Sequence, residues 1–453
     1  MPAALTWSSR ATFVLAAVGA AVGLGNIWRF PYLTGTHGGG AFVMVYLACV
    51  LAIAIPILIA ELMLGRHGRG SPPTAMASMA GQCGRSRAWS GVGWLGAWSG
   101  FLIVSFYSVI GGWTLVYVLR TFSGTFTDAP GTATAAAFAS LQGSPWLMTL
   151  WHSAFMALTL LIVARGLNRG IEAAVRLLMP ALFLMLVVTV GYAAATGDFA
   201  AGWQFLFHFD PGALNGRVVL LAVGQAFFSI GVSMGLMMMY GAYLPADQPI
   251  PRYAVIIALA DTLVAVLAGL AIFPLVFAHG LNPGEGPGLI FVTLPVAFGA
   301  MPFGALFGGL FFLLLVFAAL TSAIALIQPM VARVGEWPAM TPLRAAVLVC
   351  LGAWLLGIGS VLSFNVWADV APLGWLPGAS GQTVYALLDF VTANLMMPLG
   401  GMLIALFAGW LVPDRVLAQA LPGWRSASFR LWRLAVRVLA PAAILLVFLA
   451  NLR

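Results

Sequence analysis

The sequence predicts an all-α polytopic membrane protein, on the evidence of its composition, its apolar runs and the breaks within two of those runs. Of the 453 residues, 62% are hydrophobic and only 7% are charged, whereas a soluble domain usually carries about 25% charged residues. Apolar runs of about 18 residues or more recur along the whole chain, and each is long enough to cross a bilayer as a helix. This pattern excludes a soluble globular fold.

The apolar runs divide the chain into eleven expected spans, which are joined by short stretches rich in Gly and Pro. They lie at 10–34, 38–65, 89–122, 148–165, 170–196, 217–244, 251–280, 303–335, 340–362, 381–412 and 428–451. Two further stretches, 198–216 and 285–300, do not form spans and are expected on the outer side. The second is weakly amphipathic and is a candidate re-entrant or capping segment.

The basic residues indicate how the chain is oriented in the membrane. The formal net charge of +8 comes from arginine alone, because the sequence contains no lysine. The arginines gather in alternate joints, for example Arg66 and Arg69 after the second span and Arg165 and Arg169 after the fourth. The positive-inside rule then predicts a multi-pass protein of the plasma (inner) membrane, with the N-terminus cytoplasmic and the C-terminus outside. This distribution favours contact with membrane lipid and argues against a nucleic-acid partner.

Two of the expected spans carry helix-breaking residues at matching places. The first span is interrupted at Ala21–Gly25, within "AAVGLGN", and the sixth at Ser229–Gly235, within "SIGVSMG". The interruptions are five spans apart, as in transporters that consist of two inverted five-helix repeats. We therefore expect one transporter domain over 1–453, with five-helix repeats at 10–196 and 217–412 and an additional helix at 428–451.

The broken spans place polar groups at membrane depth. Lipid cannot satisfy the backbone groups that a break frees, so the break must face protein or a watery cavity. Freed carbonyls are good cation ligands, and half-helix N-termini attract anions. Asn26 adds a side-chain oxygen at the first break, and Asp261 in the seventh span offers a carboxylate that suits a hard cation such as Na⁺. The alternative is a first span that is merely kinked, and the second break argues against it.

Other polar residues inside the spans allow more than one interpretation. Arg29 would pair with Asp389 near the outer end of the tenth span, or would instead extend to lipid headgroups. Glu61 in the second span and Asp261 are both acids inside the membrane, and either would serve as a structural hydrogen-bonding group, with Asp261 the better candidate for an ion ligand. Thr321 and Ser322 in the eighth span would bond back to the preceding helical turn, or would complete a shell of carbonyl oxygens from the first break.

Several stretches resemble the neurotransmitter:sodium symporter family, in its bacterial amino-acid transporter branch with the leucine-transporter-type fold. They are "GAAVGLGNIWRFPY", "GGGAFVMVYL", "PILIAELMLGR", "SFYSVIGGWTL", "AVGQAFFSIGVSMG", "YGAY" and "LTSAIALIQP". The resemblance covers nearly the whole chain, and "GLGNIWRFPY" is its most specific part. It implies two inverted five-helix repeats with broken helices 1 and 6, plus an eleventh helix. It also implies Na⁺-driven import of an amino acid by alternating access.

The same resemblance implies two sodium sites and no organic cofactor. The first site would comprise the carbonyl of Ala21 with Asn26, Ser229 and Asp261, and the substrate carboxylate would complete it. The second site would be formed by backbone carbonyls and side-chain hydroxyls. The carbonyls would be those of Gly19, Val22 and Ala318, and the hydroxyls those of Thr321 and Ser322.

A central substrate pocket and two gates are implied as well. The substrate would contact Ala21, Gly23, Leu24, Gly25, Ile103, Tyr107, Phe228, Ser229, Gly231, Met234, Ser322 and Leu326. The outer gate would consist of Arg29, Asp389 and Gln225, and the inner gate of Trp7, Tyr243 and Glu336.

The sequence departs from the family pattern in three places. The family usually has an Arg just before the first Trp, but "AALTWSS" has none before Trp7, which leaves open how the inner gate closes. The sixth-span break reads Ser-Met-Gly where many relatives have Gly-x-Gly, so we expect Ser233 to narrow the pocket. A twelfth helix, common in the family, is not expected, and the oligomeric state stays open.

Together these observations favour a sodium-coupled symporter for a hydrophobic or mid-sized amino acid. Chloride independence is expected because Asp261 stands where chloride-dependent relatives have Asn, and its own charge would offset Na⁺. The alternatives are a proton-driven broken-helix carrier of amines or nucleobases, and a non-transporting sensor of the same fold. An intramembrane enzyme is not expected, because it would need a catalytic dyad or metal cluster that the spans do not offer.

Overall fold

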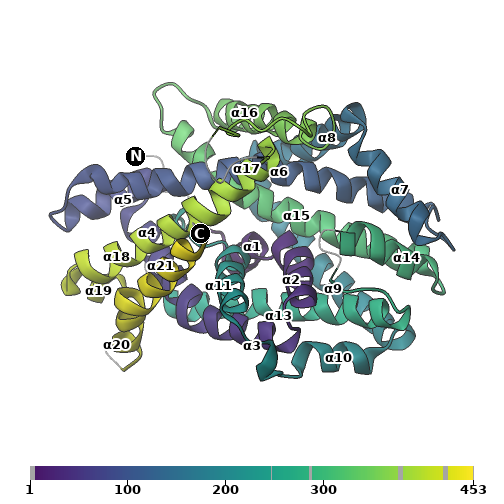
Figure 1. Ribbon diagram of the computed structural model, residues 1–453. Coiled ribbons are helices and arrows are strands. Elements are labelled where there is room, and N and C mark those ends of the chain that lie inside the picture. Colours follow the sequence, from purple (N-terminus) through teal and green to yellow (C-terminus); the bar gives the residue numbers. More distant parts are fainter. Residues whose placement is uncertain (1–5, 246, 285–287, 376–380, 422–426, 452–453) are drawn as a thin grey trace.

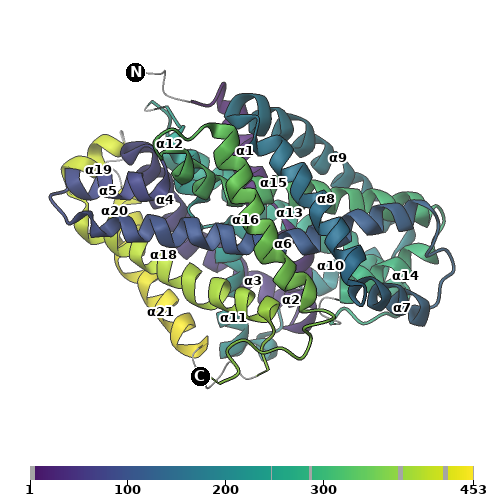
Figure 2. The same cartoon turned by 90° about the horizontal axis from the view of Figure 1, so that it is seen from above.

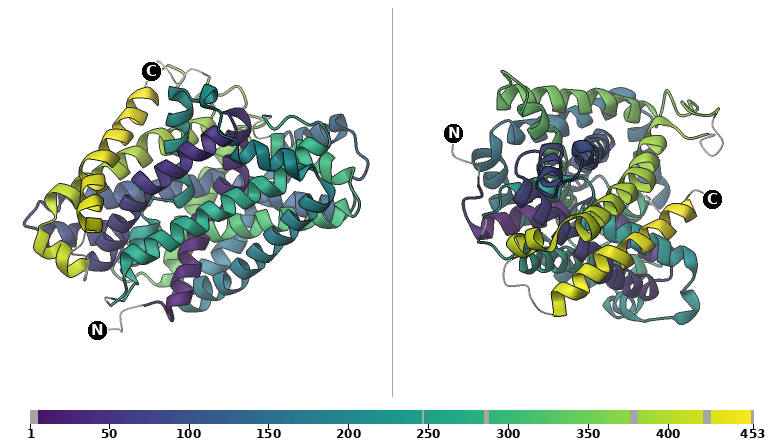
Figure 3. Two further views of the ribbon diagram at one scale, coloured as in Figure 1. Left: turned by 90° about the horizontal axis from the view of Figure 1, so that it is seen from below. Right: turned by 90° about the vertical axis from the view of Figure 1, so that its left-hand side faces the viewer.

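The computed structural model describes residues 6–245, 247–284, 288–375, 381–421 and 427–451. Within these ranges the regular elements are all helices, and the ribbon shows long helices packed side by side without a sheet (Figure 1). The start of α1 and the end of α21 lie on opposite faces of the bundle (Figure 3). That placement agrees with the odd number of spans that the sequence predicts.

Nine helical stretches of the described chain are long and apolar enough to cross a membrane. Short 3-10 or π segments, labelled η, interrupt several of them. They are α3–η2–α4 (Gly40–Gly68), η3–α6 (Arg87–Phe122), α8 (Pro145–Val163), η4–α9 (Leu167–Thr196), α13 (Ile250–Ala278), α15 (Gly304–Gly335), α16 (Pro342–Leu362), α17–η7–α18–η8 (Val384–Leu411) and α20–η9–α21 (Ala427–Leu449). Local signals start some of them, such as the Ser144 cap before Pro145 and the Thr341 cap before Pro342.

The two remaining spans are broken, as the sequence predicts. The first consists of α1 (Arg10–Ala21), then η1 (Gly25–Arg29) and α2 (Phe30–Thr36), and its two halves are bent by 50°. The sixth consists of α11 (Gly216–Ile230) and α12 (Leu236–Ala242). Its helix continues through Ser229 to Ile230, so this break is shorter than the expected Ser229–Gly235. Left-handed backbone at Gly231 and Gly235, with φ of 72° and 74°, ends one half and begins the other.

Glycines hold the second half of the sixth span tightly against α4. A Cβ on Gly65 would lie 1.8 Å from the carbonyl oxygen of Met238, and one on Gly241 would lie 2.5 Å from that of Leu62. Such contacts leave no room for any side chain. Close backbone packing of this kind is how membrane helices associate where lipid provides no hydrophobic driving force. The second span therefore fixes the position of α12, the second half of the broken sixth span.

The broken helices lie inside the bundle and shorter elements surround it. In Figure 1 α1 and α11 lie near the centre, and in both views α20 lies toward one side of the molecule and α7 (Gly131–Gln142) at the opposite side (Figures 1 and 2). Stretch 198–216 forms α10 (Phe199–Phe207) and η5 (Pro211–Ala213). Stretch 285–300 forms η6 (Leu289–Thr293) and α14 (Leu294–Gly299), while its residues 285–287 lie outside the described chain. The other short helices are α5 (Pro72–Gln82) and α19 (Asp414–Ala420).

Candidate functional site

The backbone amides at the first break have left their helical partners. In a continuous helix the amides of Gly23 and Leu24 would donate to the carbonyls of Gly19 and Ala20. Here the Gly23 amide donates to Asn26 Oδ1 at 3.1 Å, and the Leu24 amide donates to the Tyr107 hydroxyl at 3.1 Å. The break therefore releases carbonyl oxygens that face protein rather than lipid, which is the arrangement that membrane helices require.

The eighth span closes against this break. Ser322 Oγ donates to the Val22 carbonyl at 3.1 Å, so one of the two adjacent hydroxyls reaches across to the first span. A Cβ on Gly23 would lie 2.5 Å from Ser322 Oγ and 2.9 Å from the Tyr107 hydroxyl. Gly23 thus allows α15 and α6 to approach the unwound backbone from two sides.

A fully buried polar cluster joins the two broken spans to the seventh. Asp261, on α13, accepts hydrogen bonds from Asn26 Nδ2 at 2.7 Å through Oδ1 and from the Ser229 hydroxyl at 2.5 Å through Oδ2. Asn26 Nδ2 also lies 2.9 Å from Ser229 Oγ and 3.0 Å from the Asp261 carbonyl. All three side chains have no solvent exposure. The structure therefore brings together the three side chains expected at the first sodium site.

One member of this cluster was missed by the sequence reasoning. Tyr46, on α3 (Gly40–Cys49), donates from its hydroxyl to Ser229 Oγ at 3.2 Å and is itself fully buried. Its only sequence signal is its place in "GGGAFVMVYL", a stretch that shows membership of a span but not a role within it. Tyr46 fixes the orientation of Ser229, because the hydroxyl of Ser229 then donates to Asp261.

Residues of the expected second site also contact one another, and the two hydroxyls among them bond differently. A Cβ on Gly19 would lie 3.5 Å from Thr321 Cβ and 2.8 Å from Met179 Sδ, so the first span passes close to α15 and α9 there. Thr321 Oγ1 donates back to the carbonyls of Phe317 at 3.0 Å and Ala318 at 3.1 Å. The hydroxyl of Thr321 thus follows the ordinary helical pattern, whereas that of Ser322 donates to a carbonyl of the first break.

A cavity of about 180 Å³ lies beside the first break. It is lined by Leu24, Gly25, Trp28, Arg29, Tyr32, Phe106, Tyr107, Ile110, Phe228, Tyr385 and Asp389. Four expected substrate residues are among them, and the sequence reasoning missed the other aromatic walls. Expected pocket residues Ile103, Met234 and Leu326 are buried but do not line this cavity. A Cβ on Gly100 would meet the carbonyls of both Leu326 and Met234.

Ser233 does not narrow this cavity as expected. Its Oγ points to α18 (Met397–Leu406), where a Cβ on Gly401 would lie 2.7 Å from it. Its backbone is left-handed, with φ of 72°, which is unusual for a residue with a side chain. The buried carboxylate of Glu61 accepts the Ser233 amide and so holds this conformation. Glu61 thus has a structural role, which is to hold the backbone of the sixth-span break through the Ser233 amide.

Two of the three expected outer-gate residues, Arg29 and Asp389, face the same cavity without forming an ion pair. The salt bridges among the described residues do not include one between Arg29 and Asp389, although both line the cavity. The Arg29 guanidinium instead stands 4.7 Å from the centre of the Phe228 ring. Gln225 Nε2 donates to the Gly25 carbonyl at 2.8 Å, which connects this gate to the first break.

The opposite end of the pathway, beside the N-terminal segment, is closed by aromatic packing. Trp7 is 5% exposed, donates from Nε1 to the Tyr240 carbonyl at 3.2 Å, and packs edge-on against Tyr240 and Tyr243. The amide of Ser8 donates to Glu172 Oε1 at 2.8 Å, and Arg176 donates to both Ser8 Oγ and Glu172. The role of Glu172 was not foreseen, since it depends on a contact between residues 164 positions apart.

Glu336 takes partners that do not involve the N-terminal segment. It accepts hydrogen bonds from the amide and hydroxyl of Ser71 at 2.7 and 2.8 Å, and from the Thr74 hydroxyl at 2.6 Å. Arg333 adds an ion pair at 3.5 Å. Glu336 therefore connects the end of α15 to the start of α5, and of the expected inner gate only Trp7 and Tyr243 contact each other directly.

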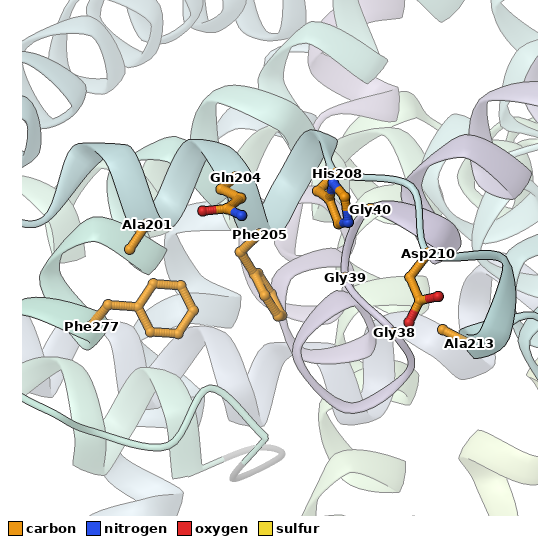
Figure 4. A pocket seen from close by; sticks show the side chains of 10 residues that line it. All are labelled: Gly38, Gly39, Gly40, Ala201, Gln204, Phe205, His208, Asp210, Ala213 and Phe277. Carbon is orange, nitrogen blue, oxygen red and sulfur yellow. The ribbon is translucent and has the colours of Figure 1, made fainter.

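A separate hollow of about 440 Å³ lies between the loop Gly38–Gly40 and α10 (Figure 4). Figure 4 shows His208 and Asp210 beside the glycine loop, with Phe205 and Phe277 further along. It shares no residue with the cavity at the first break. Its walls contain none of the residues expected from the sequence, so the candidate site remains at the broken helices.

Comparison with known proteins gives matches over nearly the whole chain. The model of the sodium:neurotransmitter symporter family matches residues 5–135 and 145–452. An uncharacterised sodium-dependent transporter of Bacillus subtilis is 39% identical over 446 residues, which are 98% of this chain and 96% of the relative. Another, from Haemophilus influenzae, is 32% identical over 99% of this chain and 98% of its own length.

A solved structure also matches. The crystal structure of MhsT in complex with L-phenylalanine superposes with a TM-score of 0.90 at 40% identity, over 99% of each chain. This match confirms the expected fold class: two inverted five-helix repeats with broken helices 1 and 6, plus an eleventh helix.

We predict that Trp7→Ala opens the closed end of the pathway. Cysteine introduced at Met239, which is buried on α12 beside Tyr243, would report the opening through its rate of maleimide labelling. Truncation of a buried Trp costs about 3–5 kcal/mol, so we expect labelling to rise about tenfold or more. The measurement uses a background in which Cys49, Cys83 and Cys350 are replaced.

Two variants control this experiment. Trp7→Phe keeps most of the packing and should restore slow labelling. Trp203→Ala removes a Trp that is 51% exposed on α10 and should change nothing. Equal labelling of the Trp7→Ala variant and its parent would show that other contacts close this end.

Proposed function

The chain belongs to the sodium:neurotransmitter symporter family, and we propose that it imports a hydrophobic or mid-sized amino acid with Na⁺ by alternating access. Its membership makes it a sodium-dependent multi-pass membrane transporter and not an enzyme. The proposal adds the substrate class, the ion sites and the direction of transport. The observation that carries it is the buried cluster of Asp261, Ser229 and Asn26 beside the first break.

In the first sodium site, the ion would neutralise the Asp261 carboxylate. An ionised carboxylate without a counter-charge is very costly in a buried site. Here the amide nitrogen of Asn26 stands against the carboxylate, while its oxygen accepts from Gly23. Because a nitrogen donor cannot ligate Na⁺, Asn26 would turn its Oδ1 toward the ion. The Ala21 carbonyl, the Ser229 hydroxyl and the substrate carboxylate would complete the shell.

The second sodium site would form between the first break and α15. Its ligands would be the carbonyls of Gly19, Val22 and Ala318 and the hydroxyls of Thr321 and Ser322. The bond from Ser322 to the Val22 carbonyl already joins the two elements. An ion held there would tie the first span to the eighth and so favour the arrangement in which the inner end is closed.

The substrate would place its carboxylate at the break and its side chain among apolar groups. The amides at Gly23–Gly25 and the Tyr107 hydroxyl are polar groups at the carboxylate end. Ile103, Phe228, Met234 and Leu326 offer no charge partner for a side chain, and an unpaired buried charge is costly. The relative MhsT was crystallised with L-phenylalanine, which supports an apolar substrate. Leucine-like or aromatic amino acids are therefore favoured over lysine or glutamate.

Transport would alternate between the two ends of the pathway. We place the N-terminus in the cytoplasm from the arginine distribution, which makes the Trp7 end the inner gate and the Arg29 end the outer gate. The repeats would comprise 10–196 and 217–412, with 428–451 as the additional helix. Pairing of Arg29 with Asp389 across the cavity would close the outer end once the substrate is bound.

The two alternative functions predict different transport behaviour. A proton-driven carrier of amines or nucleobases would transport without sodium, but adjacent hydroxyls at the second site favour Na⁺ over a proton. A sensor of the same fold would bind the ligand and show no flux. Counterflow in proteoliposomes, with and without a sodium gradient, separates all three.

We predict that sodium and substrate bind with positive coupling, because the substrate carboxylate would complete an ion shell. Such coupling is typically worth about 1–3 kcal/mol and is reciprocal, so Na⁺ should tighten substrate binding by about 5- to 150-fold. A thermal-shift screen of amino acids in Na⁺ and in choline measures this, since a ligand stabilises the state that binds it. Equal affinity in the two salts would exclude the shared ion shell.

We predict that Thr321→Val combined with Ser322→Ala abolishes sodium-dependent uptake while the protein still inserts. Both changes keep the side-chain volume nearly constant and remove only oxygens. Thr189→Val is the matched control, because Thr189 is also a buried helical Thr whose hydroxyl bonds back, to Met185, at 2.8 Å. Unchanged sodium dependence of uptake in the double variant would assign the two hydroxyls to helix bonding alone.

We predict that uptake does not need chloride. Asp261 supplies the negative charge beside Na⁺, and one turn away Ala265 is buried and offers no hydroxyl to an anion. Replacement of chloride by gluconate should leave wild-type uptake unchanged. Asp261→Asn should impair uptake or make it respond to chloride, whereas Asp198→Asn, at a helix cap outside the spans, should do neither. Loss of wild-type transport without chloride would overturn this assignment.

A further inference from the structure

A long apolar groove lies on the flank of the bundle, away from the transport pathway. Its volume is about 830 Å³, within the range of ligand-binding pockets. The second span, α13 and α20–η9 form its walls. Leu51 and Leu431 on these walls are 61% and 67% exposed. The yellow helices that form its outer wall lie at the margin of the molecule (Figures 1 and 3).

Two irregular helical turns border the groove. π-helical turns occupy Val50–Ala54 on the second span and Ala435–Leu439 on the last one. Each such turn displaces the side chains that follow it from the regular helical pattern. Trp432 on α20 connects the last span to the second span, because its Nε1 donates to the Pro56 carbonyl at 3.0 Å. A buried hydrogen bond therefore joins two walls of the groove.

One end of the groove carries its polar groups. Arg252 lies in the first turn of α13, and Ser428 lies in the first turn of α20. Arg252 is exposed, and the salt bridges among the described residues do not include it. Residues deeper in the groove are apolar, and none of the described residues that line it is acidic. A cation and a hydroxyl thus stand at the mouth of an apolar channel.

We propose that this groove binds one anionic glycerophospholipid, with its acyl chain along the apolar walls and its phosphate at Arg252 and Ser428. Basic pockets between spans recognise anionic headgroups on the cytoplasmic side of membranes. On the orientation proposed above, the starts of α13 and α20 lie at that side. The lipid would connect the second, seventh and last spans at a distance from the transport cavity.

A second copy of the chain fits the groove less well. In a twofold pair the same patch of each subunit meets its partner, which would place the unpaired Arg252 side chains of both copies in one interface. The groove offers no acidic residue to offset them. A phospholipid supplies the missing negative charge and the apolar chain at once.

Native mass spectrometry of the full chain in mild detergent tests the proposal. The probes are phosphatidylglycerol and phosphatidylcholine with the same acyl chains, and inorganic phosphate without any chain. We expect one saturable site that prefers phosphatidylglycerol by about fivefold, the effect of one Arg near a headgroup. Arg252→Gln should remove that preference. Ala435→Phe, which fills the groove, should weaken both lipids.

Arg344→Gln is the matched control, because Arg344 is also exposed in the first turn of a span and lies outside the groove. It should keep the full preference. If the Arg252 and Arg344 variants lose the preference for phosphatidylglycerol equally, that preference comes from general surface charge, and the proposal is overturned. Displacement of the bound phospholipid by inorganic phosphate alone would also overturn it, and so would loss of a dimer in Ala435→Phe without loss of lipid.

Discussion

The buried carboxylate of Asp261 is the constraint on which the centre of this protein depends. It has no solvent exposure and lies in a chain that is 62% hydrophobic. Such a group is tolerated only where charge or hydrogen bonds compensate its lost hydration. Its partners Asn26 and Ser229 come from the two broken spans. The carboxylate therefore ties both breaks to the seventh span, and a cation bound there would act on three elements at once.

The breaks themselves are supported from outside the site. Glu61 accepts the amide of Ser233, whose positive φ helps the sixth span to turn. Contacts of Gly65 and Gly241 then fix α12 against α4. The second span thus acts as a rigid support on which the unwound segment rests. Strained backbone at a functional site persists only where the surroundings over-determine it, and here a carboxylate and close helix packing do so.

Much of this arrangement could be predicted from the sequence, for physical reasons that also explain the omissions. Span positions follow from long apolar runs, and the first break follows from Gly23, Gly25 and Asn26 inside one of them. Tyr46 and Glu172 act through partners 183 and 164 positions away, so no local pattern reveals them. The direction of the Ser233 side chain depends on its left-handed backbone and on Gly401, which composition alone cannot show.

In the orientation proposed above, the end of the bundle beside Trp7 would be the inner gate, and it would close without the arginine that the family usually has before the first Trp. Glu336 already has Ser71, Thr74 and Arg333 as partners, so its carboxylate is compensated without that arginine. The N-terminal segment is held instead by the Trp7 packing and by the bond from Ser8 to Glu172. Aromatic contacts avoid the desolvation cost of a buried ion pair. Because Glu172 lies in the π-helical turn Leu167–Glu172 that begins the fifth span, release of Ser8 would free that turn and α1 together.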